Sequence, residues 1–392
     1  MKALNILVVG SGMYVCGRGT QGYGTIIPAL YEWGRKHCIN NLYLAATSPN
    51  GITLTKNKIG ELRRNMGIGV SLRYFPEGKE KNSECYKQAI NEIPRPACAI
   101  ISVPDYLHKE IAAYAIKSGL HALVVKPLAP TLREVSSLIQ LQEKANVYCA
   151  VEFHKRLDAA NLKLKDAIMQ GIIGDPLYFL VEYSQRRDVP MTHFKKWVSS
   201  TNVFQYLGIH YVDIVYYVTG AIPKRIMAIG QKNLLSSKGI DAYDSIQAVI
   251  EWKMPTGNTF TSTLITNWID PDKTSAMSDQ KIKVIGTKGR FESDQKNRGV
   301  YIVSVKAGIE EPNPYFCAPY GSLGSVSYQG YGIDSICQFL DDVVRIEEKE
   351  IGINDLEDKR PTFRQSIIPT AVLEAVNNSL RSKSKWVSIG GI

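Results

Sequence analysis

Short apolar runs alternate with amphipathic segments over the first 150 residues, and this alternation constrains the fold more than any other feature. The first run, 4–10 (LNILVVG), is almost continuously apolar, as in a strand buried on both faces of a sheet. Strictly alternating strands and helices predict right-handed crossovers and a doubly wound parallel sheet, an α/β fold. The other strands are predicted at 41–47, 72–75, 97–103, 121–125 and 147–153, and the helices at 25–37, 56–66, 83–93, 108–117 and 132–144.

The second half of the chain has a different pattern, with strands joined mainly by turns. Such a pattern predicts an α+β domain with a large, mostly antiparallel open sheet. We therefore predict two domains, 1–153 and 154–392. The strands are expected at 177–184, 225–230, 245–253, 259–268, 281–285 and 300–305, and the helices at 158–170, 202–218, 334–347 and 363–380.

Composition excludes several classes of protein. The chain has 392 residues, of which 44% are hydrophobic and 21% charged, as in an ordinary globular protein. No apolar run approaches the ~20 residues that span a bilayer, and we interpret 4–10 as a strand rather than a signal peptide. The net charge is +10, but the basic residues are dispersed, so we predict neither a nucleic-acid nor a membrane partner. Seven cysteines without a CxxC pair predict reduced thiols, a cytoplasmic location and no metal site.

The first predicted strand runs into a glycine-rich loop. Gly10 and Gly12 follow the strand, Met13 comes next, and a helix is predicted from about position 25. Between a strand and a helix, such glycines let backbone N–H groups approach a pyrophosphate. The third glycine of a GxGxxG pattern is absent, since Val15 stands there. We predict that Gly10, Gly12 and Met13 bind a dinucleotide; the alternative is a surface loop without a ligand.

The end of the second predicted strand bears on the choice between NAD and NADP. NAD sites of this type carry an acidic residue there, which binds the ribose 2′-hydroxyl. This chain has Thr47 and Ser48 instead, and basic residues follow at 56, 58, 63 and 64. These groups favour a 2′-phosphate, so we predict NADP over NAD as the cofactor. The alternative for the basic residues is a solvated helix face.

The stretch 97–135 carries a further set of motifs. A strand ends in Val103 and Pro104, His108 follows, and the next strand ends in Lys126 and Pro127. Together with GIHYVD at 208–213 and KIKVIGTKGRFE at 281–292, this pattern resembles the Gfo/Idh/MocA family, which includes glucose–fructose oxidoreductase and inositol dehydrogenase. The resemblance extends over nearly the whole chain.

The resemblance implies an NAD(P)-dependent oxidoreductase. Such an enzyme moves a hydride between a nicotinamide and a secondary alcohol or ketone, here of a sugar, a sugar derivative or a polyol. It also implies that 1–153 is a dinucleotide-binding Rossmann domain and that 154–392 binds substrate and forms oligomers. Few helices are available to cover the second sheet, so we expect a homodimer or homotetramer through it.

The resemblance also assigns candidate site residues. Lys126 and His210 are candidate catalytic residues, since a lysine at a strand end can polarise a hydroxyl and a histidine exchanges protons near neutral pH. Tyr206 is a third candidate, because the family often has an Asp there; packing is the alternative. The expected cofactor contacts add Val103, Pro104, His108, Lys126 and Pro127 to the glycine loop, and the expected substrate contacts are Lys126, His154, His210 and Asp213.

Several alternatives stay open on the sequence alone. His108 could cap the helix that follows it, and His154 could form a salt bridge at the domain junction. The pattern departs from the family at Val125, where a Glu normally precedes the Lys-Pro pair. Two other functions are compatible with a dinucleotide loop: an NAD-dependent glycosidase that retains its cofactor, and a non-catalytic dinucleotide sensor.

Overall fold

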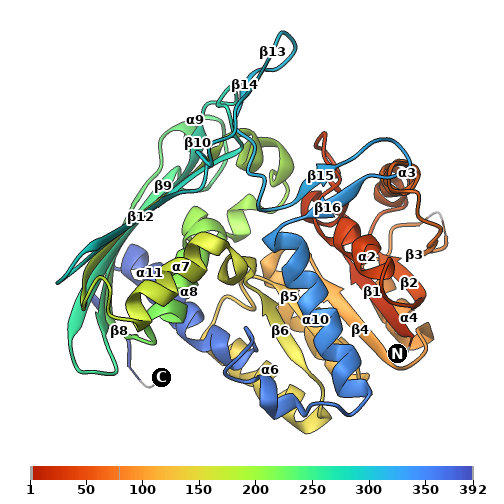
Figure 1. Ribbon diagram of the computed structural model, residues 1–392, viewed down its shortest axis with the longest axis horizontal. Helices are drawn as coiled ribbons and strands as arrows, with labels where there is room; N and C mark the ends of the chain where they lie inside the picture. The colour runs from red at the N-terminus through yellow and green to blue at the C-terminus, as the bar shows by residue number, and fades with distance from the viewer. Residues whose placement is uncertain (1–2, 79, 391–392) are drawn as a thin grey trace. The chain divides into compact units, whose positions relative to one another are not determined.

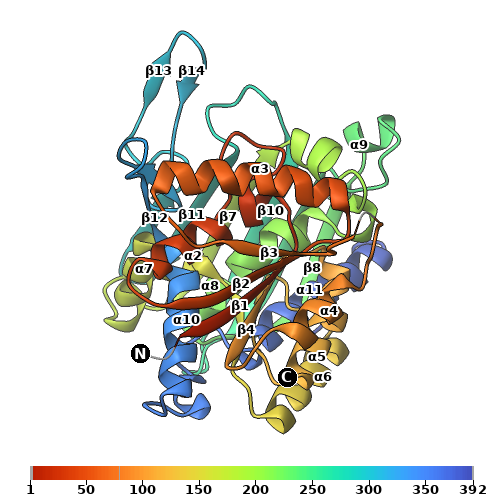
Figure 2. The same ribbon diagram turned by 90° about the vertical axis from the view of Figure 1, so that its right-hand side faces the viewer.

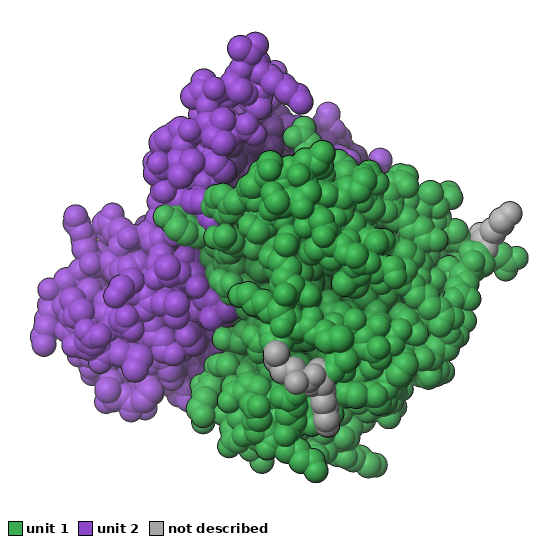
Figure 3. All heavy atoms as spheres, turned by 45° about the vertical axis from the view of Figure 1, so that its right-hand side comes forward, with its two compact units in different colours: residues 1–129, 133–154, 315–366 green, residues 130–132, 155–314, 367–392 purple. Residues whose placement is uncertain are grey.

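The computed structural model describes residues 3–78 and 80–390, and the chain forms two compact units (Figures 1 and 3). The first unit contains Met1–Ala129, Arg133–His154 and Tyr315–Ser366. The second contains Pro130–Leu132, Lys155–Pro314 and Ile367–Ile392. No helix of the described part is long and apolar enough to cross a membrane.

The first unit is built on a six-stranded parallel sheet in the order β3-β2-β1-β4-β5-β6, which confirms the predicted doubly wound fold. β1 and β4 are buried along their whole length because their apolar side chains face helices on both sides. The strands are β1 (Leu4–Val9), β2 (Ile39–Ala45), β3 (Leu72–Phe75), β4 (Ala97–Ile101), β5 (His121–Val125) and β6 (Cys149–Glu152).

Helices cover both faces of this sheet. Figure 2 shows α2 and α10 on one side of the strands and α4, α5 and α6 on the other. The helices between the strands are α1 (Met13–Cys16), α2 (Ile26–Gly34), α3 (Pro49–Met66), α4 (Cys85–Glu92), α5 (His108–Lys117) and α6 (Leu132–Ala145). Short helical turns lie at η1 (Asp105–Leu107) and η2 (His154–Leu157).

One segment lies outside the domain in which the sequence analysis placed it. Residues 315–366, expected within 154–392, belong to the first unit. Its helix α10 (Tyr331–Glu347) buries Ile336, Phe339, Leu340 and Val343 in the same core as α2. The physical reason is that the parallel sheet needs cover on both faces, and α10 supplies part of one face. The segment also contains the hairpin β15 (Ala318–Tyr320) and β16 (Ser327–Gln329), and the turns η6 (Ile353–Leu356) and η7 (Arg364–Ser366).

The second unit is built on a seven-stranded sheet in the order β12-β11-β7-β10-β9-β8-β17. Only the pairing of β7 with β10 is parallel, so the prediction of a mostly antiparallel sheet is confirmed. The strands are β7 (Pro176–Arg186), β8 (Ile222–Gln231), β9 (Ser245–Lys253), β10 (Thr259–Asp270), β11 (Ser278–Gly286), β12 (Arg290–Asp294) and β17 (Val387–Ser388).

Helices pack on one face of the second sheet. Figure 1 shows α7 (Ala159–Met169), α8 (Ile209–Thr219) and α11 (Ile367–Arg381) on the same side of the strands. Within the described residues of this unit, no helix covers the opposite face. Three helical turns precede α8, namely η3 (Val189–His193), η4 (Val198–Ser200) and η5 (Phe204–Gly208), and α9 (Leu234–Ser237) follows β8.

The strand expected at 300–305 is shorter and does not join the sheet. β13 (Ile302–Ser304) pairs only with β14 (Gly308–Glu310) in a separate hairpin. Its apolar residues are exposed, Val303 to 76%, because the described part of this unit offers them no core to pack against.

Candidate active site

The carboxyl ends of the parallel strands bring most of the predicted cofactor residues to one edge of the sheet. Gly10 follows β1, Thr47 and Ser48 follow β2, Val103 follows β4, and Lys126 follows β5. The strand order reverses between β1 and β4. In open α/β sheets, ligands bind outside the carboxyl ends at such a reversal.

In the glycine turn, only glycine fits at Gly10, and the backbone is uncovered at Gly12. Gly10 has φ +119°, and a Cβ there would lie 2.0 Å from the Ser102 carbonyl oxygen. Gly12 has φ −82°, and a Cβ there would meet nothing within 4 Å. The turn therefore leaves its backbone accessible at Gly12, which is the feature a pyrophosphate needs. The residues present fit a dinucleotide.

The sequence analysis expected a loop from Gly12 to about position 25, but a short helix interrupts it. Met13 is the first residue of α1, a helix of four residues that ends at Gly17 in a left-handed conformation. The chain then turns through residues 18–24, and α2 begins at Ile26. A Cβ at Gly17 would lie 1.9 Å from the Gly22 carbonyl oxygen, so close backbone packing explains the extra glycines of this loop.

Arg18 is a residue that the sequence analysis did not single out. Its Nη1 donates to Ser11 Oγ at 3.0 Å and lies 2.6 Å from where a Cβ on Gly51 would stand. Ser48, the N-cap of α3, accepts a hydrogen bond from the Gly51 amide at 3.4 Å. Arg18 thus lies between the glycine turn and the end of β2. The only sequence signal was an isolated arginine in a glycine-rich loop.

Two of the four basic residues of α3, Lys58 and Arg63, bond to backbone carbonyls of nearby loops. Lys58 Nζ donates to the carbonyl oxygens of Gln21 and Gly22, both at 3.1 Å. Arg63 donates to the carbonyl of Gly69 at 3.2 Å. These two side chains bond to neighbouring loops, a structural role that differs both from phosphate binding and from the solvated helix face given as the alternative.

His108 links two of the loops at the carboxyl edge. Its Nδ1 lies 2.7 Å from the Pro127 carbonyl oxygen, and its Nε2 lies 2.9 Å from the Val103 carbonyl oxygen. Burial lowers the pKa of His108. The ring does not cap α5, the alternative raised by the sequence, because α5 has no side-chain cap bond. Instead it fixes the loop after β4 against the loop that contains Lys126.

Lys126 is a half-buried amine at the end of β5. Burial lowers the pKa of Lys126 to about 7, against the opposing effect of the carboxylates of Glu152 and Asp105. An amine that titrates near neutral pH can donate or accept a proton under working conditions. Strongly shifted groups of this kind concentrate at functional sites.

His154 contacts a carboxylate within the first unit. Its Nδ1 lies 2.8 Å from Glu152 Oε2, and Ser335 Oγ donates to Glu152 Oε1 at 2.8 Å. The His154 ring stacks with Tyr331 at 5.8 Å between centroids. This environment favours the salt-bridge alternative for His154 over the predicted substrate contact.

His210, Tyr206 and Asp213 lie in or beside α8 of the second unit. His210 is 4% exposed, and its ring centroid lies 6.3 Å from that of Tyr183. Tyr206 lies in η5, a π-helical turn, whereas His210 lies in α8. The two residues therefore do not share one regular α-helix. The Tyr206 ring meets Phe194 edge-on at 4.7 Å, an arrangement that favours the packing alternative.

Asp213 is held by an arginine. Arg156 Nε lies 2.9 Å from Asp213 Oδ2, and Arg156 Nη2 lies 2.6 Å from Oδ1. Both carboxylate oxygens are therefore engaged by one guanidinium in a buried bidentate pair. This contact favours a structural role for Asp213 rather than the predicted contact with substrate.

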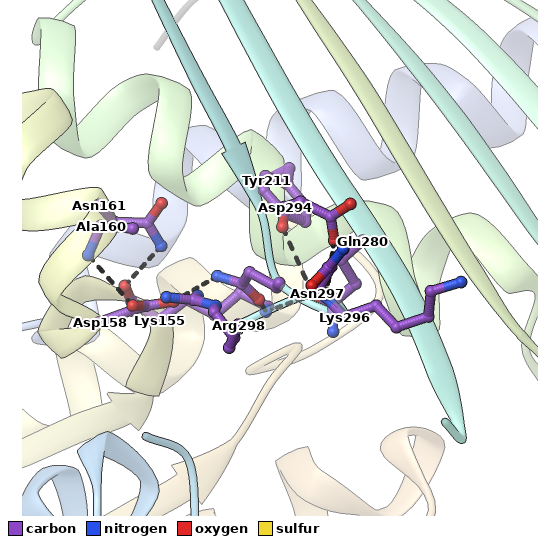
Figure 4. Close-up of polar contacts among 11 residues, drawn as sticks. Lys155, Asp158, Ala160, Asn161, Tyr211, Gln280, Asp294, Lys296, Asn297 and Arg298 are labelled. Carbon is purple, nitrogen blue, oxygen red and sulfur yellow. Dashed lines mark hydrogen bonds and ion pairs between the residues drawn. The ribbon is translucent and has the colours of Figure 1, made fainter. Parts of the chain in front are cut away.

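A buried lysine, Lys155, lies in the second unit, and the sequence analysis gave it no role. Lys155 is 2% exposed and donates to Gln295 Oε1 at 2.6 Å and to Gln280 Oε1 (Figure 4). Its ammonium also lies 5.3 Å from the centroid of the Tyr211 ring. Beside it, Asp158 pairs with Arg298 at 2.7 Å. The signal in the sequence was a pair of basic residues, Lys155 and Arg156, shortly after a predicted strand.

Two protein-family models match parts of the chain. The description "Oxidoreductase family, NAD-binding Rossmann fold" matches residues 73–153. The description "GFO/IDH/MocA C-terminal domain" matches residues 161–292. The two matches cover parts of the first and the second unit, respectively.

Characterised relatives are similar over part of their length. The chain is 25% identical over 218 residues to the myo-inositol 2-dehydrogenase of Thermotoga maritima, covering 55% of this chain and 62% of that protein. It is 25% identical over 170 residues to the scyllo-inositol 2-dehydrogenase (NADP(+)) of Bacillus subtilis, covering 42% of this chain and 47% of that protein. The match thus spans less than two thirds of each relative.

Solved structures share the fold over the whole chain. The scyllo-inositol dehydrogenase of Lactobacillus casei, solved with bound NAD(H) and scyllo-inositol, has a TM-score of 0.68 at 16% identity, with 100% of both chains covered. The myo-inositol 2-dehydrogenase of Lactobacillus plantarum has a TM-score of 0.70 at 19% identity, covering 99% of this chain and 100% of that chain. At these identities the likeness establishes the fold.

We predict that the half-buried amine of Lys126 makes stability depend on pH. The lowered pKa means that between pH 7 and about 10.4 the unfolded chain binds more protons than the folded chain, so the free energy of unfolding rises with pH. Lys126→Met removes this dependence, at most about 1.4 kcal/mol per pH unit and less because the side chain is only half-buried. Urea unfolding at pH 6, 7.5 and 9 measures it.

The control is Lys117→Met, which removes an exposed lysine at the end of α5. It should leave the pH dependence of unfolding unchanged. Parallel pH profiles for the wild type and Lys126→Met would show that the amine titrates as an ordinary exposed lysine.

Proposed function

We propose a dehydrogenase or reductase function on one premise: the chain belongs to the Gfo/Idh/MocA family of oxidoreductases. The reaction is the transfer of a hydride between a nicotinamide cofactor and a secondary alcohol or ketone of a sugar, a sugar derivative or a polyol. The relatives named above act on inositols, which are polyols with only secondary hydroxyls. Their names support the substrate class.

One observation carries the proposal: an amine of lowered pKa at the carboxyl edge of a doubly wound sheet. Oxidising an alcohol removes a hydride from carbon and a proton from oxygen, and the bound nicotinamide supplies the hydride acceptor. Lys126 can donate a hydrogen bond to the reacting hydroxyl when protonated, and it can accept the hydroxyl proton when neutral. With a pKa of about 7, both forms are populated near neutral pH.

The experiment is a turnover assay with NAD and NADP against a panel of inositols and sugars, followed by reduced-nicotinamide absorbance. Net reduction of free cofactor with at least one polyol supports the proposal. Two alternatives predict no net reduction, and a product assay separates them: a glycosidase with retained cofactor cleaves a glycoside, whereas a sensor changes no substrate.

We assign cofactor binding to the carboxyl edge of the first unit. The bare backbone at Gly12, the loop of Val103 and Pro104, and the loop of Lys126 and Pro127 follow neighbouring strands. Met13 follows in α1, and Thr47 and Ser48 lie between β2 and α3. Within this assignment, Gly10 and His108 maintain the shape of the loops through close backbone packing and hydrogen bonds.

We propose that NADP is preferred over NAD. No carboxylate follows β2, and Arg18 lies beside Ser48 and the first turn of α3. Arginine suits a phosphate because its fork of N–H donors matches phosphate oxygens. The Bacillus relative, whose name includes NADP(+), supports this preference; the Lactobacillus casei structure holds NAD(H), so the family uses both.

We assign a second catalytic role, as general base or acid, to His210 of the second unit. Its ring lies in a buried aromatic setting on α8, at the position that matches the histidine of the family's motif. Tyr206 remains a candidate for proton relay, although its contacts favour packing. Because all seven cysteines are free thiols, we place the protein in a reducing compartment such as the cytoplasm.

We predict that Gly12→Val weakens dinucleotide binding at least about tenfold while the protein stays folded. A Cβ at Gly12 meets no protein atom within 4 Å, so valine fits the fold but occupies the space above the turn. Isothermal titration measures the affinity, and a thermal melt checks the fold. Wild-type affinity in the folded variant would contradict the assignment of this turn.

We predict that Arg18→Ala lowers the affinity for NADP by about 10- to 100-fold and leaves that for NAD nearly unchanged, since hydrogen bonds to charged groups contribute ~1.5–3 kcal/mol. The control is Arg64→Ala, which removes an exposed charge from α3. Equal losses for both dinucleotides would show that Arg18 only maintains the loop.

We predict that His210→Asn lowers kcat by about 10²–10⁴-fold, the usual contribution of general acid–base catalysis. Lys126→Met should also slow turnover, and the double variant should lose less than the product of the two losses if both residues serve one proton transfer. Dinucleotide affinity should change little in His210→Asn. Tyr206→Phe separates relay from packing, because only a relay requires the hydroxyl; near-normal kcat in His210→Asn would reject its assignment.

We predict a homodimer or homotetramer in which a second copy covers the bare face of the seven-stranded sheet. Leu180, Val249 and Ile265 occupy that face on three adjacent strands and are only partly covered within the described chain. Ile265→Lys should therefore shift the particle mass in light scattering toward the monomer. Leu323→Lys, an equal change at an exposed residue of the first unit, should not. A monomeric wild type at micromolar concentration would contradict the prediction.

A further inference from the structure

Tyr14 connects the glycine turn to a distant part of the first unit. It follows Met13 in α1, two residues after Gly12, and its backbone carbonyl accepts a hydrogen bond from the Thr25 amide at 2.8 Å. Its side chain reaches His154 in η2, where the hydroxyl lies 3.4 Å from Nδ1 and the two ring centroids are 6.2 Å apart. Glycines have no side chains with which to hold the turn, so neighbours such as Tyr14 supply its outside contacts.

His154 extends this contact to a buried carboxylate. Glu152 is 2% exposed, and its Oε2 lies 2.8 Å from His154 Nδ1. Its other oxygen, Oε1, accepts a hydrogen bond from Ser335 Oγ of α10 at 2.8 Å. A carboxylate only accepts hydrogen bonds, so His154 Nδ1 carries the proton that lies between them. Four side chains thus form one connected polar chain from α10 to α1, in the order Ser335, Glu152, His154 and Tyr14.

The Tyr14 hydroxyl is kept as a neutral donor. Burial raises the pKa of Tyr14 well above its usual value, and the charge of Glu152 and a hydrogen bond to it raise the pKa further. The hydroxyl therefore keeps its proton near neutral pH. Hydrogen bonds that involve a charged group are stronger than those between neutral groups, so the loss of this hydroxyl should be measurable.

The C-terminal part of the first unit meets the glycine loop at a second place. Cys317 Sγ donates to the Gly24 carbonyl oxygen at 3.4 Å. Phe316 and Tyr331 pack against the His154 ring, with centroids at 5.2 and 5.8 Å. These contacts come from the segment 315–366, which follows the second sheet in sequence but belongs to the first unit. The segment therefore lies against the glycine loop as well as against the parallel sheet.

We propose that Tyr14 and Ser335 are positioning residues for the dinucleotide: the polar chain that joins them holds α1, and with it the turn at Gly12, in the conformation that receives the pyrophosphate. This inference rests on the proposed function, in which the dinucleotide binds at that turn. It gives the segment 315–366 a part in the cofactor site, in addition to its cover of the sheet.

α1 depends on contacts of this kind because it is short. A helix of four residues gains little stability from its own hydrogen bonds, so its position is set by what it packs against. Val15 and Cys16 bury their side chains, and Tyr14 adds a polar anchor to η2. Loss of that anchor should loosen the start of α1, next to Gly12, while the apolar contacts keep the helix in the fold.

The first experiment examines the turn in the protein without ligand. Amide hydrogen exchange is followed by mass spectrometry for a peptide that spans residues 10–17 and for a peptide from β4. In Tyr14→Phe, which keeps the ring, exchange in 10–17 should become at least about threefold faster, the effect of losing one hydrogen bond. Exchange in β4 should not change. Unchanged exchange in 10–17 overturns the proposal.

Ser335→Ala tests the far end of the polar chain and leaves the peptide 10–17 chemically unaltered. Exchange in 10–17 should again become faster, and the double variant with Tyr14→Phe should show less than the combined effect of the two single changes, because both act on one chain. Ser335→Thr keeps a hydroxyl and should restore wild-type exchange. No effect in Ser335→Ala also overturns the proposal, since the chain would then not extend to α10.

The second experiment measures dinucleotide affinity by isothermal titration. The turn is assigned to the pyrophosphate, which NAD and NADP share, so Tyr14→Phe should weaken the binding of both equally, by about threefold to tenfold. Arg18→Ala, in contrast, should weaken that of NADP alone. In a turnover assay, the KM for the dinucleotide should rise by a larger factor than kcat falls, because Tyr14 acts on binding and not on the reacting atoms.

Two matched controls lie in the same unit. Tyr114→Phe removes the hydroxyl of another half-buried tyrosine, which donates to Asn91 Oδ1 at 3.2 Å between α5 and α4. Glu347→Gln changes the last residue of α10, which lies 3.0 Å from His121 at the amino end of β5. Neither variant should change exchange in 10–17 or dinucleotide affinity. An equal effect in either control would indicate general loosening of the unit and would overturn the proposal.

Exchange and binding together separate this inference from the proposed function. A wild type that binds neither NAD nor NADP rejects the proposed function, whereas the exchange result still supports or overturns the anchoring of α1. Folded variants that bind both dinucleotides as tightly as a wild type that binds them overturn this inference and leave the proposed function in place.

Discussion

A parallel sheet must be covered on both faces, and the first unit of this protein depends on meeting that requirement. β1 and β4 carry apolar side chains on both sides and are buried along their whole length. The helices between the strands cover one face and only part of the other. The chain completes the cover with α10, from residues that follow the whole second sheet in sequence. Both faces of the sheet are thereby covered by helices. The carboxyl ends of the strands stay uncovered by them, and the candidate site lies there.

Local patterns in the sequence predicted the elements well where packing and local preference agree. β3, β5 and β9 have the predicted bounds, because each is a short apolar or alternating run between clear turns. The position of α10 could not be predicted in this way. Its apolar stripe shows that one face is buried, but the stripe does not identify the partner. Assigning 315–366 to the second domain followed from chain order, and the contact with α2 is a long-range property.

The candidate site shows the same limit at single residues. Gly10 and Lys126 could be placed from the sequence, since both directly follow strands whose ends were clear. Arg18 could not, because its position depends on the turn that Gly17 makes against Gly22. Tyr206 and His210 were both expected in one helix, 202–218; the π-helical turn at 204–208 interrupts that helix. A π-turn has no signature in hydrophobic periodicity and becomes visible only in the backbone.

Two lysines, Lys155 and Lys126, show how the surroundings of an amine bear on whether it can react. Lys155 donates to the amide oxygens of Gln280 and Gln295, and two tyrosine rings lie beside its ammonium. Such an ammonium is a fixed structural cation. Lys126 has carboxylates near it but titrates at about pH 7, because burial outweighs their attraction. A proton acceptor requires that near-balance: enough desolvation to release the proton, and enough negative charge to take it back.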